Sequence, residues 1–292
     1  MSCAKKAEKI VLITNTKKDT DLSLYKEIIA LAHSYGVEVR TPEAYREQCF
    51  DARVKYMPDE CVYEGADAAV VLGGDGTILK AATGAVRSGC PILGVNLGRV
   101  GYMAEVGKDE IALIKKLFEG DYRISERMTL TVWLEDGGVR VAIYENALND
   151  VAIHSDKIGR VLDLEISSGG SPVAELRGDG VVISTPTGST AYSMSAGGPV
   201  LDPSLECICI TPISSLSPAA RPMVFSAEHE LKIKKGCSSS NGLFVCCDGN
   251  EGMGVCADAR IIIKRSETKA RLISLGEEQF FSVYRKKIIS AM

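Results

Sequence analysis

The sequence of 292 residues lacks three features that would each place a protein in a broad class. No run approaches the ~18 consecutive apolar residues that a membrane-spanning helix requires. Basic residues are not in excess, since 34 Lys and Arg stand against 38 Asp and Glu, whereas a nucleic-acid-binding domain usually has a basic face. The apolar run that follows the N-terminal lysines is too short for the core of a secretion signal. We therefore expect a cytoplasmic protein with neither a membrane nor a nucleic acid as its partner.

Metal-site spacing is also missing, although ten cysteines are present. A zinc site would usually combine two close cysteine pairs, or one pair with histidines at ligand spacing, and neither pattern occurs. Cys207 and Cys209 would share one face of a strand, and the adjacent Cys246 and Cys247 would point to opposite faces. Buried thiols in a reducing compartment behave mostly as small hydrophobic groups. We therefore predict that the cysteines pack in the core and that the protein itself holds no metal.

What is present indicates a sizeable globular core and, in the first third of the chain, alternating strands and helices. Hydrophobic residues make up 46% of the chain. Residues 22–35 repeat apolar side chains at helical spacing, and Gly36 follows where a left-handed cap is expected. Residues 68–72 form an apolar run that ends in glycines, as a buried parallel strand would. Strands at 9–14, 37–40 and 91–96 and a helix at 78–86 complete a βαβ rhythm, which predicts an open, mostly parallel sheet with helices on both faces.

The pattern changes after about residue 125 to short β-rich segments separated by Gly, Ser, Asn and Asp. Such a succession predicts a β-rich second domain. We therefore expect an α/β domain over residues 1–125, a β-rich domain over residues 126–268, and a C-terminal segment, residues 269–292, that returns to the first domain.

The segment GGDGT, residues 73–77, is the first candidate for chemistry. It follows the predicted buried strand and opens a helix, which is where α/β folds place phosphate-binding turns. It matches neither the Walker loop nor the dinucleotide fingerprint Gly-x-Gly-x-x-Gly. Asp75 is unusual in such a turn, because a carboxylate repels phosphate. Its presence therefore suggests a chemical role. It could accept a proton from an attacking hydroxyl or help to hold magnesium, and the structural alternative is a helix N-cap.

Two further segments carry polar side chains beside apolar runs. The hydroxyl-rich turn at 184–193, after Gly178-Asp179-Gly180 and a short apolar run, could engage sugar hydroxyls or phosphate oxygens, and Tyr192 could stack on a base. The alternative is a polar surface loop. Asn149 and Asp150, at the start of another apolar run, could bind an adenine edge and a ribose diol, or could cap a turn. We expect the nearby His154 to be structural.

Taken together, these segments resemble the NAD kinase family. The resemblance covers well over half the chain: GGDGT (73–77), NLGRVGYM (96–103), LND (148–150), RGDGVVISTPTGSTAYSMSAGGPVLDPSL (177–205), ARPMV (220–224) and CDGN (247–250). Lipid kinases and phosphofructokinase-like enzymes share the GGDGT turn, whereas TPTGSTAYS followed by SAGGP is far more specific to this family.

The resemblance implies a Rossmann-like N-terminal domain, a β-rich C-terminal domain and an active site between them. It implies phosphoryl transfer from ATP or polyphosphate to the 2′-hydroxyl of the adenosine ribose of NAD, with Asp75 as the general base. Mg²⁺ would be held mainly by substrate phosphates, and the protein would form a homodimer or homotetramer. The resemblance further implies a set of residues that bind NAD or nucleotide: Gly74, Gly76, Lys80, Asn149, Asp150, Arg160, Arg177, Asp179, Thr187, Thr190, Ala191, Tyr192, Ser193, Met194, Ser195 and Asn250.

Some positions depart from the family's pattern. Asp150 stands where Glu is also common, and the segment 212–222 lacks the histidine that many members carry near Leu216. Lys80 and Arg160 fall at positions where members vary, so their contacts follow less directly. Two other functions share parts of the pattern: a GGDGT-type lipid kinase and a non-catalytic sensor that binds NADP(H). The first would need a Gly-Thr-x-Asn-Asp segment, which is absent, and the second would be expected to have lost Asp75.

Overall fold

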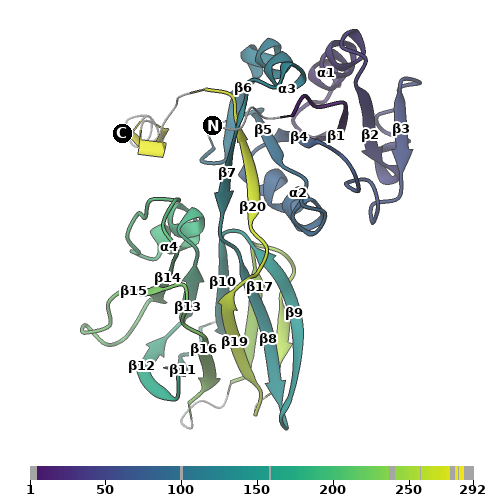
Figure 1. Ribbon diagram of the computed structural model, residues 1–292. Coiled ribbons are helices and arrows are strands. Elements are labelled where there is room, and N and C mark those ends of the chain that lie inside the picture. Colours follow the sequence, from purple (N-terminus) through teal and green to yellow (C-terminus); the bar gives the residue numbers. More distant parts are fainter. Residues whose placement is uncertain are drawn as a thin grey trace. The chain divides into compact units, whose positions relative to one another are not determined.

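The structure is a computed structural model that describes residues 5–98, 101–157, 159–236, 241–256, 258–276, 280–281 and 283–285. Its internal contacts divide the chain into two compact units (Figure 1). The first unit joins residues 1–126 to the chain from Ala270 onward, and the second is formed by Arg127–Lys269. In the described residues, no helix combines the length and the apolar character needed to cross a membrane.

The first unit is built on one sheet with the strand order β3-β2-β1-β4-β5-β20-β7, and β6 pairs with β5. Every pairing among β1 to β6 and β20 is parallel, which confirms the predicted mostly parallel sheet. The final strand in the sequence, β20, therefore lies within the sheet of the first unit. The strands are β1 (Lys9–Thr14), β2 (Glu38–Pro42), β3 (Val54–Met57), β4 (Ala68–Gly73), β5 (Ile92–Asn96), β6 (Ala104–Gly107), β7 (Arg123–Arg127) and β20 (Ala270–Ser274).

Helices cover both faces of this sheet, and for that reason β4 is buried along its whole length. Side chains alternate across a strand, so Ile10 and Leu12 face one side, where they pack in one cluster with residues of α1 (Ser23–Ser34). Figure 1 shows α1 and α3 (Lys115–Glu119) on this face and α2 (Asp75–Arg87) on the other. Two short 3₁₀ helices lie in the connections after β2 and β6: η1 (Glu43–Tyr45) and η2 (Lys108–Ile114).

The helix predicted at residues 78–86 begins three residues earlier in the structure, at Asp75. Apolar periodicity starts only at Ile78, because the turn residues before it carry no apolar side chain. This earlier start matters for function, since the GGDGT turn supplies the first turn of the helix itself.

The second unit consists of two six-stranded sheets, which confirms the β-rich prediction, and their described pairings are antiparallel. The strand orders are β15-β14-β13-β10-β17-β18 and β12-β11-β16-β19-β8-β9. One apolar cluster takes side chains from both sheets, among them Ile153, Ile183, Ile166 and Ile261. The strands are β8 (Leu130–Asp136), β9 (Val139–Ala147), β10 (Asp150–Ser155), β11 (Leu162–Ser168), β12 (Ser171–Gly178), β13 (Gly180–Ser184), β14 (Cys207–Ile213), β15 (Met223–Ser226), β16 (Leu231–Lys235), β17 (Leu243–Cys247), β18 (Met253–Val255) and β19 (Arg260–Arg265).

The expectation that the cysteines pack in the core holds for most of those that the structure describes. Five are buried, including Cys207 and Cys209 on one face of β14, and two more are half-buried. Cys256 is exposed, so the expectation was wrong for this residue. It lies just beyond the end of β18, outside the alternating pattern that directs side chains into the core.

Candidate active site

The GGDGT turn joins the C-terminal end of β4 to the N-terminus of α2. The backbone at Gly74 is extended, and the Thr77 N–H donates to the Gly74 carbonyl at 2.8 Å. Leu97, after β5, donates its N–H to the Gly73 carbonyl at 2.9 Å and so ties the turn to the next strand. The first turn of α2 therefore lies at the carboxyl edge of a parallel sheet, and the N-terminus of a helix at such an edge is a favourable place for a phosphate group.

The carboxylate of Asp75 is held by the loop that follows β5. Its Oδ2 accepts the N–H of Tyr102 at 2.9 Å, and its Oδ1 accepts the N–H of Met103 at 3.2 Å. Gly101 makes this approach possible, because a Cβ at that position would lie 2.2 Å from Asp75 Oδ1. The N-cap of α2 is Gly74, not Asp75, so the structural alternative of an aspartate N-cap is not what the structure shows. Arg99 and Val100 of the NLGRVGYM segment lie outside the described residues.

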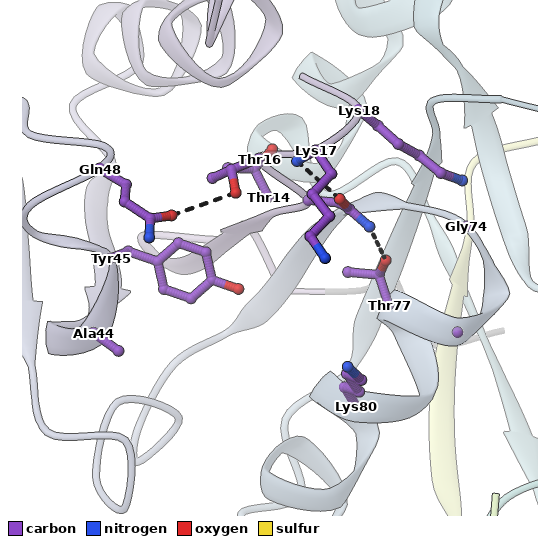
Figure 2. Close-up of a pocket in the computed structure, with 12 residues that line it drawn as sticks. Thr14, Thr16, Lys17, Lys18, Ala44, Tyr45, Gln48, Gly74, Thr77 and Lys80 are labelled. Carbon is purple, nitrogen blue, oxygen red and sulfur yellow. Dashed lines mark hydrogen bonds between the residues drawn. The ribbon is translucent and has the colours of Figure 1, made fainter. Parts of the chain in front are cut away.

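A pocket with a volume of about 590 Å³ adjoins the turn in the first unit. Figure 2 shows lysines around it, with the Tyr45 hydroxyl turned toward the same space. The Lys18 ammonium lies 3.2 Å from where a Cβ on Gly74 would stand. The lining residues are Thr14, Asn15, Thr16, Lys17, Lys18, Ala44, Tyr45, Gln48, Gly74, Gly76, Thr77 and Lys80.

Three of the residues proposed from the sequence line this pocket: Gly74, Gly76 and Lys80. Sequence reasoning missed Lys17 and Lys18. A signal for them exists, because they lie in the loop that follows β1, whose carboxyl end lies beside that of β4 in the parallel sheet.

In the second unit, the carboxylate of Asp248 fixes the backbone of the Asn149–Asp150 turn. It accepts the N–H groups of Leu148, Asn149 and Asp150 at 2.8, 2.7 and 3.1 Å. In the sequence, Asp248 is visible only as part of the CDGN segment, which does not indicate this role. The Asn149 amide oxygen is buried and has no hydrogen-bond partner within the described residues. A buried acceptor without a partner is costly, so this atom is available to a ligand donor.

Asp150 is a buried carboxyl group, with only 6% of its surface exposed. Burial, together with the nearby charge of Asp248, raises its pKa from 3.8 to about 7, while the Tyr192 N–H acts in the opposite direction. Burial also raises the pKa of Asp248, although the three backbone N–H groups oppose the rise. The Asp150 carboxyl therefore keeps its proton to a higher pH than a solvated carboxyl would.

The hydroxyl-rich turn packs directly against the Asn149–Asp150 segment. Thr185 donates its hydroxyl to the Leu148 carbonyl at 2.6 Å, and its N–H donates to the Asn149 carbonyl at 2.9 Å. Gly188 allows this contact, since a Cβ there would stand 1.9 Å from the Asn149 carbonyl oxygen. The turn continues through η3 (Thr187–Thr190) and α4 (Tyr192–Ser195).

Several hydroxyls of this turn bond within the protein. Thr190 donates to the Thr187 carbonyl at 3.3 Å, and the Ser193 hydroxyl bonds to that of Thr211 at 2.8 Å. Tyr192, in contrast, is 38% exposed and its ring stacks on His154, with 5.8 Å between ring centroids. Burial lowers the pKa of His154, opposed by the charge of Asp179, so His154 is a neutral platform for the Tyr192 ring.

Arg177, Arg160 and Asn250 stand in different surroundings. The Arg177 guanidinium lies 3.3 Å from the Asp163 carboxylate on β11 and is 67% exposed. Arg160 is exposed and has no polar contact within the described part of the chain. Asn250 donates its side-chain N–H to the Tyr144 hydroxyl at 2.8 Å. Thus Asn149, Asp150, Asp179 and Tyr192 are brought together, whereas Arg160 and Arg177 are not joined to them by any described contact.

The comparisons with known proteins cover both units. Residues 10–122 match the family described as "ATP-NAD kinase N-terminal domain", and residues 148–275 match "ATP-NAD kinase C-terminal domain". The chain is 35% identical over 283 residues to the NAD kinase of Geobacter sulfurreducens, covering 96% of this chain and 98% of that one. It is also 35% identical over 281 residues to the NAD kinase of Thermobifida fusca, covering 93% and 86%.

Two solved structures are similar in fold. A yeast NADH kinase in complex with NADH superposes with a TM-score of 0.87 at 24% identity, over 97% of this chain and 88% of that one. An NAD kinase from Archaeoglobus fulgidus in complex with ATP superposes with a TM-score of 0.73 at 28% identity, over 97% and 99%.

Proposed function

The chain belongs to the NAD kinase family, and from that premise we propose that it transfers the γ-phosphoryl group of ATP to the 2′-hydroxyl of the adenosine ribose of NAD. A bond forms between the 2′-oxygen and the γ-phosphorus, and the bond from that phosphorus to the β–γ bridging oxygen breaks. The products are NADP and ADP, and the proton of the 2′-hydroxyl is released. The Archaeoglobus fulgidus relative with bound ATP supports ATP as the donor.

The observation that carries the proposal is the fixed carboxylate of Asp75 at the N-terminus of α2. Two backbone N–H groups orient it, and a carboxylate oxygen that accepts one N–H can still accept a hydroxyl proton. Asp75 thus takes the proton of the 2′-hydroxyl while the turn N–H groups stabilise the charge on the transferred phosphoryl group. Phosphoryl transfer depends mostly on such positioning and charge stabilisation.

The residues around Asn149 and Asp150 would hold the adenosine portion of NAD. The buried amide oxygen of Asn149 is suited to accept a donor such as the exocyclic amine of adenine. The exposed ring of Tyr192, backed by His154, offers a flat surface for a base. Other residues proposed to line this pocket are Thr187, Thr190, Ala191, Ser193, Met194 and Ser195, with Arg160, Arg177, Asp179 and Asn250 as further contacts.

Magnesium is part of the proposal. Within the described residues, no group of three or more His, Cys, Asp or Glu side chains is placed to hold a metal ion. Mg²⁺ commonly binds through substrate phosphates, water and one or two carboxylates, and the turn offers the carboxylate of Asp75. The residues therefore fit an ion that arrives with the nucleotide, where it neutralises phosphate charge.

We also propose, from the family resemblance, that the chain forms a homodimer or homotetramer and works in the cytoplasm. Light scattering on the purified protein tests the first part, with a monomer as the contradicting result.

The test of the activity is a coupled assay with NAD, ATP and Mg²⁺, in which a strictly NADP-dependent dehydrogenase detects NADP. Wild type should make NADP, and Asp75→Asn should lose at least ~100-fold in kcat while it still binds NAD. Asp109→Asn, an exposed aspartate of the same unit, is the matched control and should be fully active. Near-normal turnover of Asp75→Asn would refute the base assignment. Folded wild-type protein that binds NAD but makes no NADP would indicate a sensor.

A further inference from the structure

The segment that carries Tyr192 is tied to the sheet beneath it by a pair of buried hydroxyl groups. The Ser193 hydroxyl, in α4, bonds to the Thr211 hydroxyl, in β14, at 2.8 Å. Both residues are 0% exposed, so neither hydroxyl is open to solvent or to a ligand. The helix also packs against β13, which lies beside β14 in the same sheet (Figure 1). The hydroxyl pair therefore joins α4 to this sheet inside the second unit.

Thr211 reaches α4 because side chains alternate along β14. Ile208 and Ile210 pack in the apolar cluster that both sheets share. Cys209 and Thr211 therefore face the opposite side of the sheet, where α4 lies. The Cys209 thiol is 3.6 Å from the Thr211 hydroxyl. Because a thiol is a weak hydrogen-bonding group, Ser193 is the stronger partner of Thr211.

Gly198, in the SAGGP segment, brings the backbone directly over the two hydroxyls. Its N–H donates to the Ser193 carbonyl at 2.8 Å. A Cβ at this position would lie 2.3 Å from the Ser193 hydroxyl oxygen and 2.7 Å from that of Thr211. Any larger residue would therefore push the two hydroxyls apart, which accounts for the glycine at this position of the segment.

The hydroxyl pair controls the position of the Tyr192 ring, because Tyr192 directly precedes Ser193. The helix α4 has only four residues, so its own backbone bonds give it little stability. The orientation of the Tyr192 ring over His154 therefore depends on bonds to other elements. Without the Thr211 hydroxyl, the buried Ser193 hydroxyl would lack this partner, which is costly. Rotation of the turn to find another partner would move the neighbouring ring.

We propose that Thr211 and Ser193 are positioning residues for dinucleotide binding, and that their buried hydroxyl pair holds the Tyr192 ring in the orientation that stacks on a base. The family motif implied that Ser193 binds NAD, whereas its burial gives the hydroxyl this indirect role. Thr211 lies in none of the segments that carry the family resemblance. The inference rests on the proposed function, because that function makes Tyr192 part of the adenosine site.

The first test is the coupled assay with the full-length protein, together with calorimetric titration of NAD. Thr211→Val keeps the shape of the side chain and removes its hydroxyl. It should raise both KM and Kd for NAD by ~5-fold or more, which is the effect of losing about one buried hydrogen bond. The values of kcat and of KM for ATP should not change, because Asp75 and its turn belong to the first unit. Thr211→Ser restores the hydroxyl and should restore KM for NAD.

Thr131→Val is the matched control, since the Thr131 hydroxyl bonds to the Ser266 hydroxyl at 2.7 Å in another buried pair of the second unit. It should lower the free energy of unfolding about as much as Thr211→Val does and leave KM for NAD unchanged. Equal rises of KM in the two Val variants would indicate a general effect of lost stability and would overturn the proposal.

Ser193→Ala removes the other hydroxyl of the pair and should reproduce the rise in KM for NAD. Combined with Thr211→Val, it should add little, because both substitutions remove the same bond. Fully additive effects would show that the two hydroxyls act separately, contrary to the proposal.

The orientation of the Tyr192 ring also has a spectroscopic signature. The sequence contains three histidines, and the imidazole of His154 stacks on the Tyr192 ring, whose ring current shifts the His154 proton resonances. In Thr211→Val these resonances should move toward their positions in Tyr192→Leu, which has no ring there. In Thr131→Val and Thr211→Ser they should stay as in wild type. Unchanged His154 resonances in Thr211→Val would refute the positioning role, even if KM rose.

The resonance and calorimetric measurements need no turnover, so they separate this inference from the proposed function. If wild type makes NADP and Thr211→Val keeps both its NAD affinity and its His154 resonances, the positioning role fails while the activity stands. If wild type makes no NADP but Thr211→Val loses NAD affinity and shifts the His154 resonances, the activity fails while the positioning role stands.

Discussion

The buried carboxyl of Asp150 makes the stability of the second unit depend on pH in a calculable way. Burial and the charge of Asp248 raise the pKa of Asp150 from 3.8 to about 7. Between these two values the folded chain keeps a proton that the unfolded chain has released. The free energy of unfolding therefore falls as pH rises, by about 1.4 kcal/mol per pH unit for this group, and levels off above about pH 7.

Replacing Asp150 by Asn removes this pH-dependent fall in the free energy of unfolding, because the amide carries no charge at any of these pH values. A difference of about 3 pH units corresponds to about 4 kcal/mol. Relative to wild type, Asp150→Asn should be equally stable near pH 4 and more stable by about 4 kcal/mol at pH 8. The stability difference between Asp150→Asn and wild type should increase progressively between these two pH values.

The assay is urea unfolding at pH 4 to 8, followed by tryptophan fluorescence. Trp133 is the only tryptophan in the sequence and lies on β8, so its emission reports on the unit that contains Asp150. Asp136→Asn, an exposed aspartate at the end of the same strand, is the matched control and should show no such trend. A stability difference between wild type and Asp150→Asn that stays constant from pH 5 to 8 would refute the reasoning.

Three further predictions concern the site. Gly101→Ala should displace the Asp75 carboxylate, because the new Cβ would stand 2.2 Å from Oδ1, and kcat should fall at least ~10-fold with NAD affinity retained. Gly254→Ala, where a Cβ meets open space, should be neutral in the same assay. Asp248→Ala should leave three backbone N–H groups without an acceptor and lower the free energy of unfolding by about 2–4 kcal/mol in Trp133-monitored urea titrations; wild-type stability would contradict its role. Removing Mg²⁺ with EDTA should abolish NADP formation but leave calorimetric NAD binding intact, and equal loss of both would place the ion in the dinucleotide site.

The buried amide oxygen of Asn149 is the atom that most directly supports the proposed dinucleotide site. Local sequence identified Asn149 as a candidate but could not show that its amide oxygen is buried without a partner. Burial depends on β10, the 184–193 turn and Asp248 converging from distant parts of the chain. For Arg177, the family motif implied a contact with NAD or nucleotide. Its described partner is instead the carboxylate of Asp163, which lies outside that motif.

Features that depend on a local pattern of residues could be predicted from the sequence alone. Apolar runs followed by glycines indicated β4 and the GGDGT turn, helical spacing indicated α1, and the change of pattern after about residue 125 predicted a β-rich part of the chain. These signals are readable because burial on one or both faces imposes a fixed period on neighbouring residues. The start of α2 at Asp75 was misplaced because glycine and aspartate carry no such period.

The contacts between groups that are distant in the sequence depend on the tertiary fold. Asp75 is oriented by N–H groups 27 and 28 residues away, and Asp248 supports a turn about 100 residues before it. Lys17 and Lys18 join Lys80 around one pocket because parallel pairing sets the carboxyl ends of β1 and β4 side by side. Such contacts arise from packing and hydrogen bonding between elements, and no local period of the chain encodes them.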